Sequence, residues 1–180
     1  EMPLIPHGTN MPDLGTKNVH VRARHKIGEG KIVFSLQRLF PRKGLEYLIR
    51  AIPLVIQKYP AVQFIIGGKG PEREKLETEA RKLGVSEKVV FAGFIPDDEL
   101  KAYYAAADIF ALPSLYEGFG VVYVDALTNS VPIVTTRCGG PEDIVTEENG
   151  FLVPVRDEKA FAEALVKALG KKWERQLIKK

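Results

Sequence analysis

Residues 108–135 have the sequence DIFALPSLYEGFGVVYVDALTNSVPIVT, and this stretch decides the fold. Asp108–Leu112 at its start and Val131–Thr135 at its end are short, mostly apolar runs that predict two strands. Phe119–Asn129, between them, predicts a helix packed on the sheet despite its three valines. Strands joined through a helix run parallel, so the stretch predicts one strand–helix–strand unit of a parallel sheet.

The same alternation of strands and helices extends to both sides of this stretch. Further strands are predicted for four apolar runs: Lys31–Gln37, Ala61–Gly67, Lys88–Ala92 and Gly150–Val153. Helical spacing predicts the helices Gly44–Lys58, Pro71–Leu83, Asp97–Ala107 with Asp97 as N-cap, and Asp157–Leu169. Because the strands are apolar throughout, helices are expected on both faces of the sheet. The predicted fold class is α/β, a Rossmann-like, doubly wound, parallel six-stranded sheet in the order 3-2-1-4-5-6.

The chain divides into a central domain and two flanking segments. Residues 1–30 contain three prolines and four glycines, and we predict an N-terminal arm or interdomain linker there. Residues 31–170 carry the strand and helix pattern and form the predicted domain. Residues 171–180 place Trp173, Leu177 and Ile178 at near-helical spacing, which predicts a C-terminal helix without an evident partner in this chain.

The composition is that of a soluble globular protein. The chain has 180 residues, of which 45% are hydrophobic and 27% charged, enough for one domain with a full core. No apolar run approaches the roughly 20 residues of a membrane span, and no secretory signal is recognised. Cys138 is the single cysteine, so an internal disulfide or a cysteine-rich zinc site is excluded and a cytoplasmic location is expected.

The charge distribution argues against a nucleic-acid partner. The net charge is +3, and lysines and arginines alternate with glutamates, as in Pro71–Lys82, which is typical of a solvated helix face. Nucleic-acid binding would require a broader basic stripe. The abundance of Glu, Lys and Arg over Asn, Gln and Cys favours a thermophilic source. Peripheral membrane association of a longer parent protein is left open.

Two loops are expected at the ligand-binding edge of such a sheet, after its first and fourth strands. The first, Arg38–Gly44, places three cations beside a helix start, which indicates an anion site or, alternatively, a solvated basic turn. The second, Pro113–Gly120, has two glycines that let a ligand approach the backbone. Asp125, in the helix that follows, is either exposed between core positions or held for a ligand.

The order of motifs in the chain resembles one enzyme family. Glu117–Leu127, followed by Pro132–Val134, resembles the signature of family-four retaining glycosyltransferases of the GT-B fold, a glutamate followed after seven residues by a second acidic residue. Gln37–Gly44 is similar to the phosphate-binding loop of that family, and three later landmarks also match: Gly67–Pro71, Phe91–Phe94 and Gly139–Glu142. The resemblance runs from about Ile5 to Leu169. It implies the C-terminal, donor-binding half of a GT-B glycosyltransferase, with the acceptor held by an N-terminal domain outside this chain.

The resemblance also implies a role for each matching residue. Arg38 and Lys43 would contact the donor diphosphate, Glu117 a hydroxyl of the donor sugar, and Asp125 the ribose. Further nucleotide contacts are implied for Gly68, Phe94, Ile95, Gly118, Phe119, Gly120 and Val121. Two residues depart from the family pattern, because Asp125 replaces the usual Glu and Gln37 replaces the usual Gly before the arginine. Helix 171–180 would dock on the N-terminal domain.

The implied reaction is hexose transfer from a nucleoside-diphosphate sugar to a glycan, lipid or small-molecule acceptor, with retention of configuration. Arg38, Lys43 and a helix N-terminus would stabilise the departing diphosphate, so no cofactor or metal is expected. The sequence contains no Asp-x-Asp motif, and the spacing of His7, His20 and His25 fits no metal site. We expect the isolated domain to bind nucleotide weakly and to transfer nothing.

Several other functions are alternatives for this sequence. A nicotinamide-dependent dehydrogenase is disfavoured because Gly68–Gly70 lacks the third glycine of the fingerprint and follows the second strand instead of the first. A sugar-nucleotide epimerase or a glycan phosphorylase could share the GT-B fold. A non-catalytic module that binds nucleotide sugars is the remaining alternative.

Overall fold

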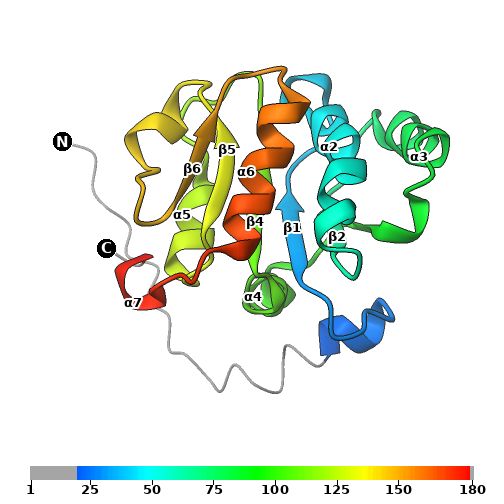
Figure 1. Ribbon diagram of the computed structural model, residues 1–180, viewed down its shortest axis with the longest axis horizontal. Helices are drawn as coiled ribbons and strands as arrows, with labels where there is room; N and C mark the ends of the chain where they lie inside the picture. Colours follow the sequence, from blue (N-terminus) through cyan, green and yellow to red (C-terminus); the bar gives the residue numbers. More distant parts are fainter. Residues whose placement is uncertain (1–19, 179–180) are drawn as a thin grey trace.

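A computed structural model describes residues 20–178 as a single parallel sheet between two layers of helices (Figure 1). The strands are β1 Ile32–Leu36, β2 Gln63–Gly67, β3 Val89–Gly93, β4 Ile109–Leu112, β5 Ile133–Thr136 and β6 Gly150–Val153. Their order is β3-β2-β1-β4-β5-β6, and every neighbouring pair is parallel. The predicted fold class and strand order are confirmed.

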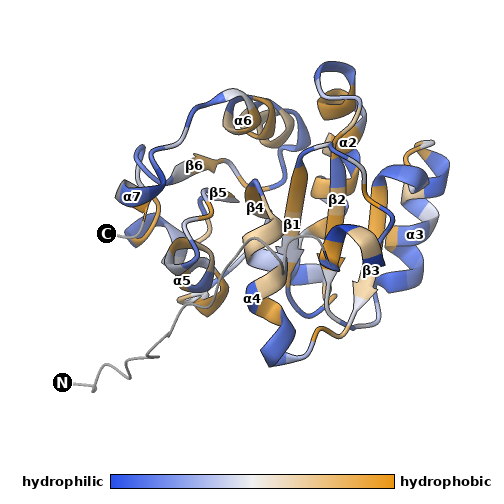
Figure 2. Cartoon of the chain, turned by 90° about the horizontal axis from the view of Figure 1, so that it is seen from below, coloured by the Kyte–Doolittle hydropathy of each residue, from blue (hydrophilic) through white to orange (hydrophobic). Residues whose placement is uncertain are grey.

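The helices cover both faces of the sheet, as the apolar strands predicted. α2 Leu45–Lys58, α3 Arg73–Lys82 and α6 Glu158–Gly170 lie on one face, and α4 Asp97–Ala106 and α5 Val121–Thr128 lie on the other (Figure 2). Short 3-10 turns occur at Pro41–Lys43, Ser86–Lys88 and Gly140–Asp143. Among residues 20–178, no helix is both long enough and apolar enough to cross a membrane.

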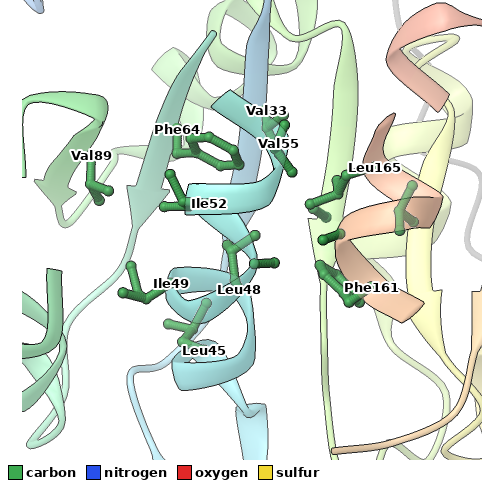
Figure 3. Close-up of a cluster of buried hydrophobic side chains, with 14 of the residues drawn as sticks. Val33, Leu45, Leu48, Ile49, Ile52, Val55, Phe64, Val89, Phe161 and Leu165 are labelled. Carbon is green, nitrogen blue, oxygen red and sulfur yellow. The ribbon is translucent and has the colours of Figure 1, made fainter. Parts of the chain in front are cut away.

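The first hydrophobic core is built on α2. Its apolar side chains recur at helical spacing and point toward the sheet and α6 (Figure 3): Leu45, Leu48, Ile49, Ile52 and Val55. Phe64 of β2 and Phe161 of α6 fill the space beside them, and both are fully buried. α2 and α6 therefore hold the loop that follows β1 against the rest of the domain.

The second core lies under α4 and α5 and is rich in aromatic rings. Phe34 of β1 packs edge-on against Tyr104 at 5.2 Å between ring centroids, and Phe110 packs edge-on against Tyr123 at 6.1 Å. Burial raises the pKa of the Tyr104 and Tyr123 phenols well above the usual range. The Tyr123 hydroxyl is paired with Thr135 Oγ1 at 3.0 Å, so α5 is fixed to the end of β5.

Part of the segment predicted as an arm belongs to this second core. Residues 20–24 form a helical turn, and Val21 and Ile27 are buried. Arg24 forms an ion pair with Glu99 of α4, and the Tyr103 hydroxyl lies 2.9 Å from Nε2 of His25. The prediction that residues 1–30 contribute no core element is therefore wrong for residues 21 and 27, whose partners on α4 are distant in sequence. Residues 1–19, including His7, lie outside the described residues.

The C-terminal segment has partners within the domain. Its helix α7 spans Arg175–Ile178, and Ile178 is buried. Trp173 packs against Phe151 and donates from Nε1 to the Ala168 carbonyl oxygen at 2.9 Å. Docking of this segment on another domain stays a prediction. Residues 179 and 180 lie outside the described residues.

Several predicted helix starts differ from the structure, and two of them lie at the edge where ligands are expected. The helix predicted from Phe119 begins at Val121, because Gly120 adopts a left-handed conformation with φ of 77°. Asp97 is the first helical residue of α4 and not its N-cap, since Pro96 takes that position and no side chain caps the helix. The first shift leaves Gly118–Gly120 in an open loop at the edge where ligands are expected.

Candidate functional site

The candidate site lies at the C-terminal edge of the sheet, where backbone hydrogen bonds join loops from four strands. Leu115 N donates to the Arg42 carbonyl oxygen at 2.8 Å, which joins the loops after β1 and β4. Glu117 N donates to the Cys138 carbonyl oxygen at 3.0 Å, which brings in the loop after β5. Leu39 N donates to the Lys69 carbonyl oxygen at 3.0 Å, which brings in the loop after β2. The loops predicted from topology are therefore in contact.

Two glycines make this close approach possible. Gly44 has φ of 63°, and a Cβ there would collide with the Pro113 carbonyl oxygen. Gly68 has φ of 114°, and a Cβ there would collide with the Gln37 carbonyl oxygen. Only glycine adopts these conformations without strain and leaves room for the facing backbone. These close backbone contacts therefore explain why glycine occupies position 44 of the Gln37–Gly44 motif and position 68 of the Gly67–Pro71 motif.

The charged centre of the site is an ion pair between Lys43 and Glu117. Lys43 comes from the loop after β1 and Glu117 from the loop after β4, and their side chains are only 12% and 14% exposed. The Ser114 hydroxyl also lies 3.4 Å from Glu117 Oε2. Sequence reasoning predicted roles for Lys43 and Glu117 separately, and the structure brings them into contact.

The loop at the start of α5 lies directly beside this pair. Gly118 and Phe119 are exposed, and Gly120 packs against Tyr123 and Glu117. Val121 begins the helix and is 64% exposed. The first amides of a helix lack internal partners and favour negative charge, so this end of α5 can receive an anion.

A hollow of about 560 Å³ opens at the same edge of the sheet, over the ends of β1, β2 and β3. Four predicted site residues line it: Arg38, Gly68, Phe94 and Ile95. Arg38 and Phe94 are exposed, whereas Ile95 is buried. Residues that sequence reasoning missed also line it: Leu36, Phe40, Lys69, Asp97, Leu100 and Val122. Of these, Lys69 had a signal, because it lies between the two glycines of a recognised motif.

One end of this hollow has an aromatic wall. The Phe94 side chain is 66% exposed, and Lys69 Nζ lies 5.7 Å from its ring centroid. Several other large apolar side chains at this edge are more than 40% exposed: Phe40, Tyr116, Phe119 and Val121. Exposed apolar clusters mark surfaces that bind ligands or other domains.

Asp125 does not join the residues that line the hollow. It is half-buried on α5, one turn beyond Val121. The pKa of the Tyr104 phenol is raised mainly by the burial of Tyr104 and secondly by the negative charge of Asp125. Its predicted ribose contact stays a prediction.

The single cysteine and the possible metal ligands do not form a second site in the described residues. Cys138 is buried, which raises its thiol pKa and makes it a poor nucleophile. Within residues 20–178, no group of three or more His, Cys, Asp or Glu side chains could hold a metal ion.

The comparison with protein families decides what the chain is related to. A family model described as glycosyl transferases group 1 matches residues 18–180. The chain belongs to this family. Membership overturns the dehydrogenase alternative and confirms the resemblance of the phosphate-loop and Glu117–Leu127 motifs to a glycosyltransferase family.

Individual glycosyltransferases of known name are similar to the chain. A GDP-mannose-dependent alpha-(1-6)-phosphatidylinositol monomannoside mannosyltransferase of Mycolicibacterium smegmatis is 40% identical over 153 residues, which is 81% of this chain and 40% of that protein. The Anabaena protein HepE, solved in complex with UDP, superposes with a TM-score of 0.80 at 26% identity, over 94% of this chain and 49% of that one.

One solved structure matches this chain in extent as well as in fold. The C-terminal domain of a group 1 glycosyltransferase, LpcC of Francisella tularensis, superposes with a TM-score of 0.72 at 28% identity. The match covers 88% of this chain and 83% of that domain. By contrast, this chain spans about 40% of the length of the curated glycosyltransferases that it matches first. The chain is thus similar in extent to that one domain.

Proposed function

We propose that this chain is the donor-binding half of a glycosyltransferase that transfers a hexose from a nucleoside-diphosphate sugar. The observation that carries the proposal is the Lys43–Glu117 pair near the start of α5, in which Lys43 shares the loop after β1 with Arg38, a residue that lines the hollow. Cations and helix amides suit a diphosphate, whereas the hollow suits a nucleoside. Family membership supports the reaction class.

Charge neutralisation explains why Lys43 and Glu117 occur together. A mostly buried carboxylate beside a diphosphate would repel it strongly if it had no counter-charge. Lys43 neutralises Glu117, so the carboxylate can bind a hydroxyl of the donor sugar while Lys43 also faces the diphosphate. Arg38 adds a planar guanidinium from the hollow side, a shape suited to phosphate oxygens.

The nucleoside is assigned to the hollow. Phe94 provides an exposed ring on which a base can stack, and Gly68 leaves the backbone open beside it. Asp125 is assigned to the ribose hydroxyls by family resemblance. Its carboxylate is one methylene closer to the helix than the usual Glu, so we propose a contact bridged by water.

Leaving-group stabilisation is the proposed contribution of this half to catalysis. Cleavage of the sugar–phosphate bond places negative charge on the nucleoside diphosphate, and Arg38, Lys43 and the α5 amides lie where they can stabilise it. These groups supply positive charge without a metal ion. We propose retention of configuration by attack on the same face of the sugar, with the acceptor bound by an N-terminal domain.

The exposed apolar side chains at this edge are consistent with an acceptor bound by a second domain. Phe40, Tyr116 and Phe119 are exposed in the two loops that carry Lys43 and Glu117, and Val121 is exposed at the start of α5. Closure of a second domain over them would exclude water from the donor. The acceptor, whether glycan, lipid or small molecule, would then come from that domain. We propose a cytoplasmic location, where nucleotide sugars are supplied and a single cysteine stays reduced.

Calorimetric titration of the chain with UDP, GDP, ADP and NAD, with and without EDTA, tests this function. We expect one nucleoside diphosphate to bind with an affinity that EDTA leaves unchanged. Loss of binding in EDTA would contradict metal independence, and binding of NAD alone would contradict the donor-site assignment. For the parent enzyme, turnover of the nucleotide sugar without an acceptor would indicate an epimerase instead.

A further inference from the structure

The hollow at the C-terminal edge places a few charged groups among apolar ones. Its apolar lining includes the side chains of Leu36, Phe94, Ile95, Leu100 and Val122. Its charged lining residues are Arg38, Lys69 and Asp97, and we assign Arg38 to the diphosphate. Small-molecule sites commonly combine apolar walls with a few polar groups that fix orientation and specificity. Lys69 and Asp97 are therefore the charged groups available to the base.

Lys69 and Asp97 come from two different loops that are joined to each other. Lys69 lies in the loop after β2, and Asp97 is the first residue of α4, which follows β3. Both residues are exposed. Gly68 N donates to the Gly93 carbonyl oxygen at 2.6 Å, which links the two loops. The cation and the carboxylate thus line the part of the hollow that lies over β2 and β3.

Phe94 provides a ring on which the base can stack in this part of the hollow. It precedes Asp97 by three residues, and its side chain is 66% exposed. Lys69 Nζ lies 5.7 Å from the centroid of the ring. Because the ammonium is carried on a flexible four-carbon stem, it can move from the ring to the edge of a base stacked there. One ring, one cation and one carboxylate are therefore available to a single base.

The bases differ in what their edges offer to such a pair of charges. Guanine presents the O6 acceptor beside two donors, N1–H and the 2-amino group, so that an ammonium can donate and both oxygens of a carboxylate can accept. Adenine presents an amino donor beside a ring-nitrogen acceptor, which is the reverse order. Uracil has one N–H donor between two carbonyl oxygens, one of which would face the carboxylate. A cation and a carboxylate together therefore favour guanine.

We propose that Lys69 and Asp97 select guanine, so that the donor is a guanosine-diphosphate sugar. This inference rests on the proposed function, because it identifies the base bound in the same donor site. Lys69 Nζ donates to guanine O6, and the Asp97 carboxylate accepts from N1–H and the 2-amino group while the base stacks on Phe94. Hydrogen bonds to charged groups are about twice as strong as neutral ones, and a base without the matching groups would leave these charges unpaired.

Calorimetric titration of the chain with GDP, inosine diphosphate, UDP and ADP tests the choice of base. Inosine diphosphate carries guanine's ring without the 2-amino group. We expect the wild type to bind GDP about 10-fold more tightly than inosine diphosphate, and UDP and ADP more weakly still. Tighter binding of UDP or ADP than of GDP would overturn this inference and leave the proposed function standing. Binding of none of the four would reject both.

Two variants separate the two contacts. Asp97→Ala removes both acceptors, so we expect GDP affinity to fall by about 10- to 100-fold and the preference for GDP over inosine diphosphate to disappear. Lys69→Met removes the cation, so both nucleotides, which share O6, should weaken by the same factor of roughly 10. An unchanged preference in Asp97→Ala, or unchanged affinities in Lys69→Met, would overturn the inference.

Neighbouring exposed residues supply matched controls. Asp98→Ala changes the next carboxylate, which lines a different hollow with Arg24, and Lys82→Met changes an exposed lysine at the end of α3. Both control variants should bind GDP as the wild type does. Melting temperatures without ligand check that all four variants remain folded, which is expected because each altered side chain is exposed. Equal losses of GDP affinity in Lys82→Met and Lys69→Met would show a general effect of charge and would also overturn the inference.

Discussion

The N-terminal and C-terminal ends of the parallel strands form two opposite edges of the sheet. Both edges carry charged side chains, but these side chains have different partners. At the N-terminal edge, Lys31 Nζ donates to the Leu169 carbonyl oxygen at the end of α6, and Asp108 Oδ2 accepts from Ile32 N at 2.8 Å. At the C-terminal edge, Arg38 is exposed at an open hollow. Charged groups bond to the backbone at the first edge, whereas Arg38 remains accessible at the second.

Charge alone therefore does not identify the edge that binds a ligand. A hollow also exists at the N-terminal edge, lined by Lys31, Asp108 and Trp173, but its polar groups are engaged. Trp173, for example, donates to the Ala168 carbonyl oxygen. The C-terminal edge combines the exposed cation Arg38 with exposed apolar side chains. Accessible side chains, and not charge by itself, distinguish this edge from the other.

The largest effect should come from a glycine at the C-terminal edge. Gly68→Ala forces a Cβ onto the Gln37 carbonyl oxygen at a φ that alanine avoids, and we expect it to lower the free energy of unfolding by about 3 kcal/mol. Nucleotide affinity should fall as well, because the loop after β1 shifts. Thermal unfolding and calorimetry measure the two effects.

Gly28→Ala is the control at the N-terminal edge, where nothing lies within 4 Å of the added Cβ. We expect its stability to stay within about 0.5 kcal/mol of the wild type. Equal losses in the free energy of unfolding of Gly68→Ala and Gly28→Ala would show that the close packing of Gly68 on Gln37 does not stabilise the C-terminal edge.

The sequence predicted the fold well because its signal is periodic and local. The apolar run of β1 and the helical spacing of Leu45, Leu48 and Ile52 in α2 each specify an element on their own. Residues 21 and 27 were missed because their burial depends on α4, about 75 residues away in the chain. The start of α5 was misplaced because Gly120 adopts a left-handed conformation that a composition pattern does not specify.

The candidate site was predicted in part, for a physical reason. Topology identifies the loops after β1 and β4, and the family resemblance selects Arg38, Lys43 and Glu117 within them. The contact between Lys43 and Glu117 depends on how the two loops pack, and no spacing along the chain encodes it.

The next largest effect should come from Lys43 when it is compared with Lys31. Lys43→Met removes a proposed diphosphate ligand and leaves Glu117 without its counter-charge, so we expect nucleoside diphosphate affinity to fall by roughly 10- to 100-fold. Lys31→Met should leave that affinity within about twofold and lower stability by about 1 kcal/mol, because a carbonyl at the α6 end loses its donor. If both lysine variants weakened binding equally, the functional difference between the edges would be refuted.

A smaller effect should separate two aspartates. Asp108→Ala leaves the buried N–H of Ile32 without an acceptor, and we expect a loss of about 1–2 kcal/mol with unchanged nucleotide affinity. Asp97→Ala removes an exposed carboxylate at the hollow and should cost less than about 1 kcal/mol through the helix dipole. Chemical denaturation measures both variants, and a greater loss for Asp97→Ala would reverse the assignment of structural roles.

The smallest effect should be a pH dependence from His25, in the segment that leads into β1. Burial, and secondly the charge of Arg24, hold the pKa of His25 below its ordinary value, while the Tyr103 hydroxyl contacts the ring. The unfolded chain therefore binds a proton more readily than the folded one once the pH falls below about 6.5. The stability contributed by neutral His25 is complete above that pH and is lost as the pH decreases through it.

Melting temperatures between pH 7.5 and 5.5 test this contribution. We expect the wild type to lose about 1–2 °C more over this range than His25→Gln, which cannot take up the proton. His20→Gln, at the exposed histidine of the same segment, should behave as the wild type does. An identical pH slope in His25→Gln and wild type would mean that His25 is as accessible to protons in the folded chain as in the unfolded one. The segment at residues 20–27 would then lie loosely on α4, and the N-terminal edge would be less tightly closed than its hydrogen bonds indicate.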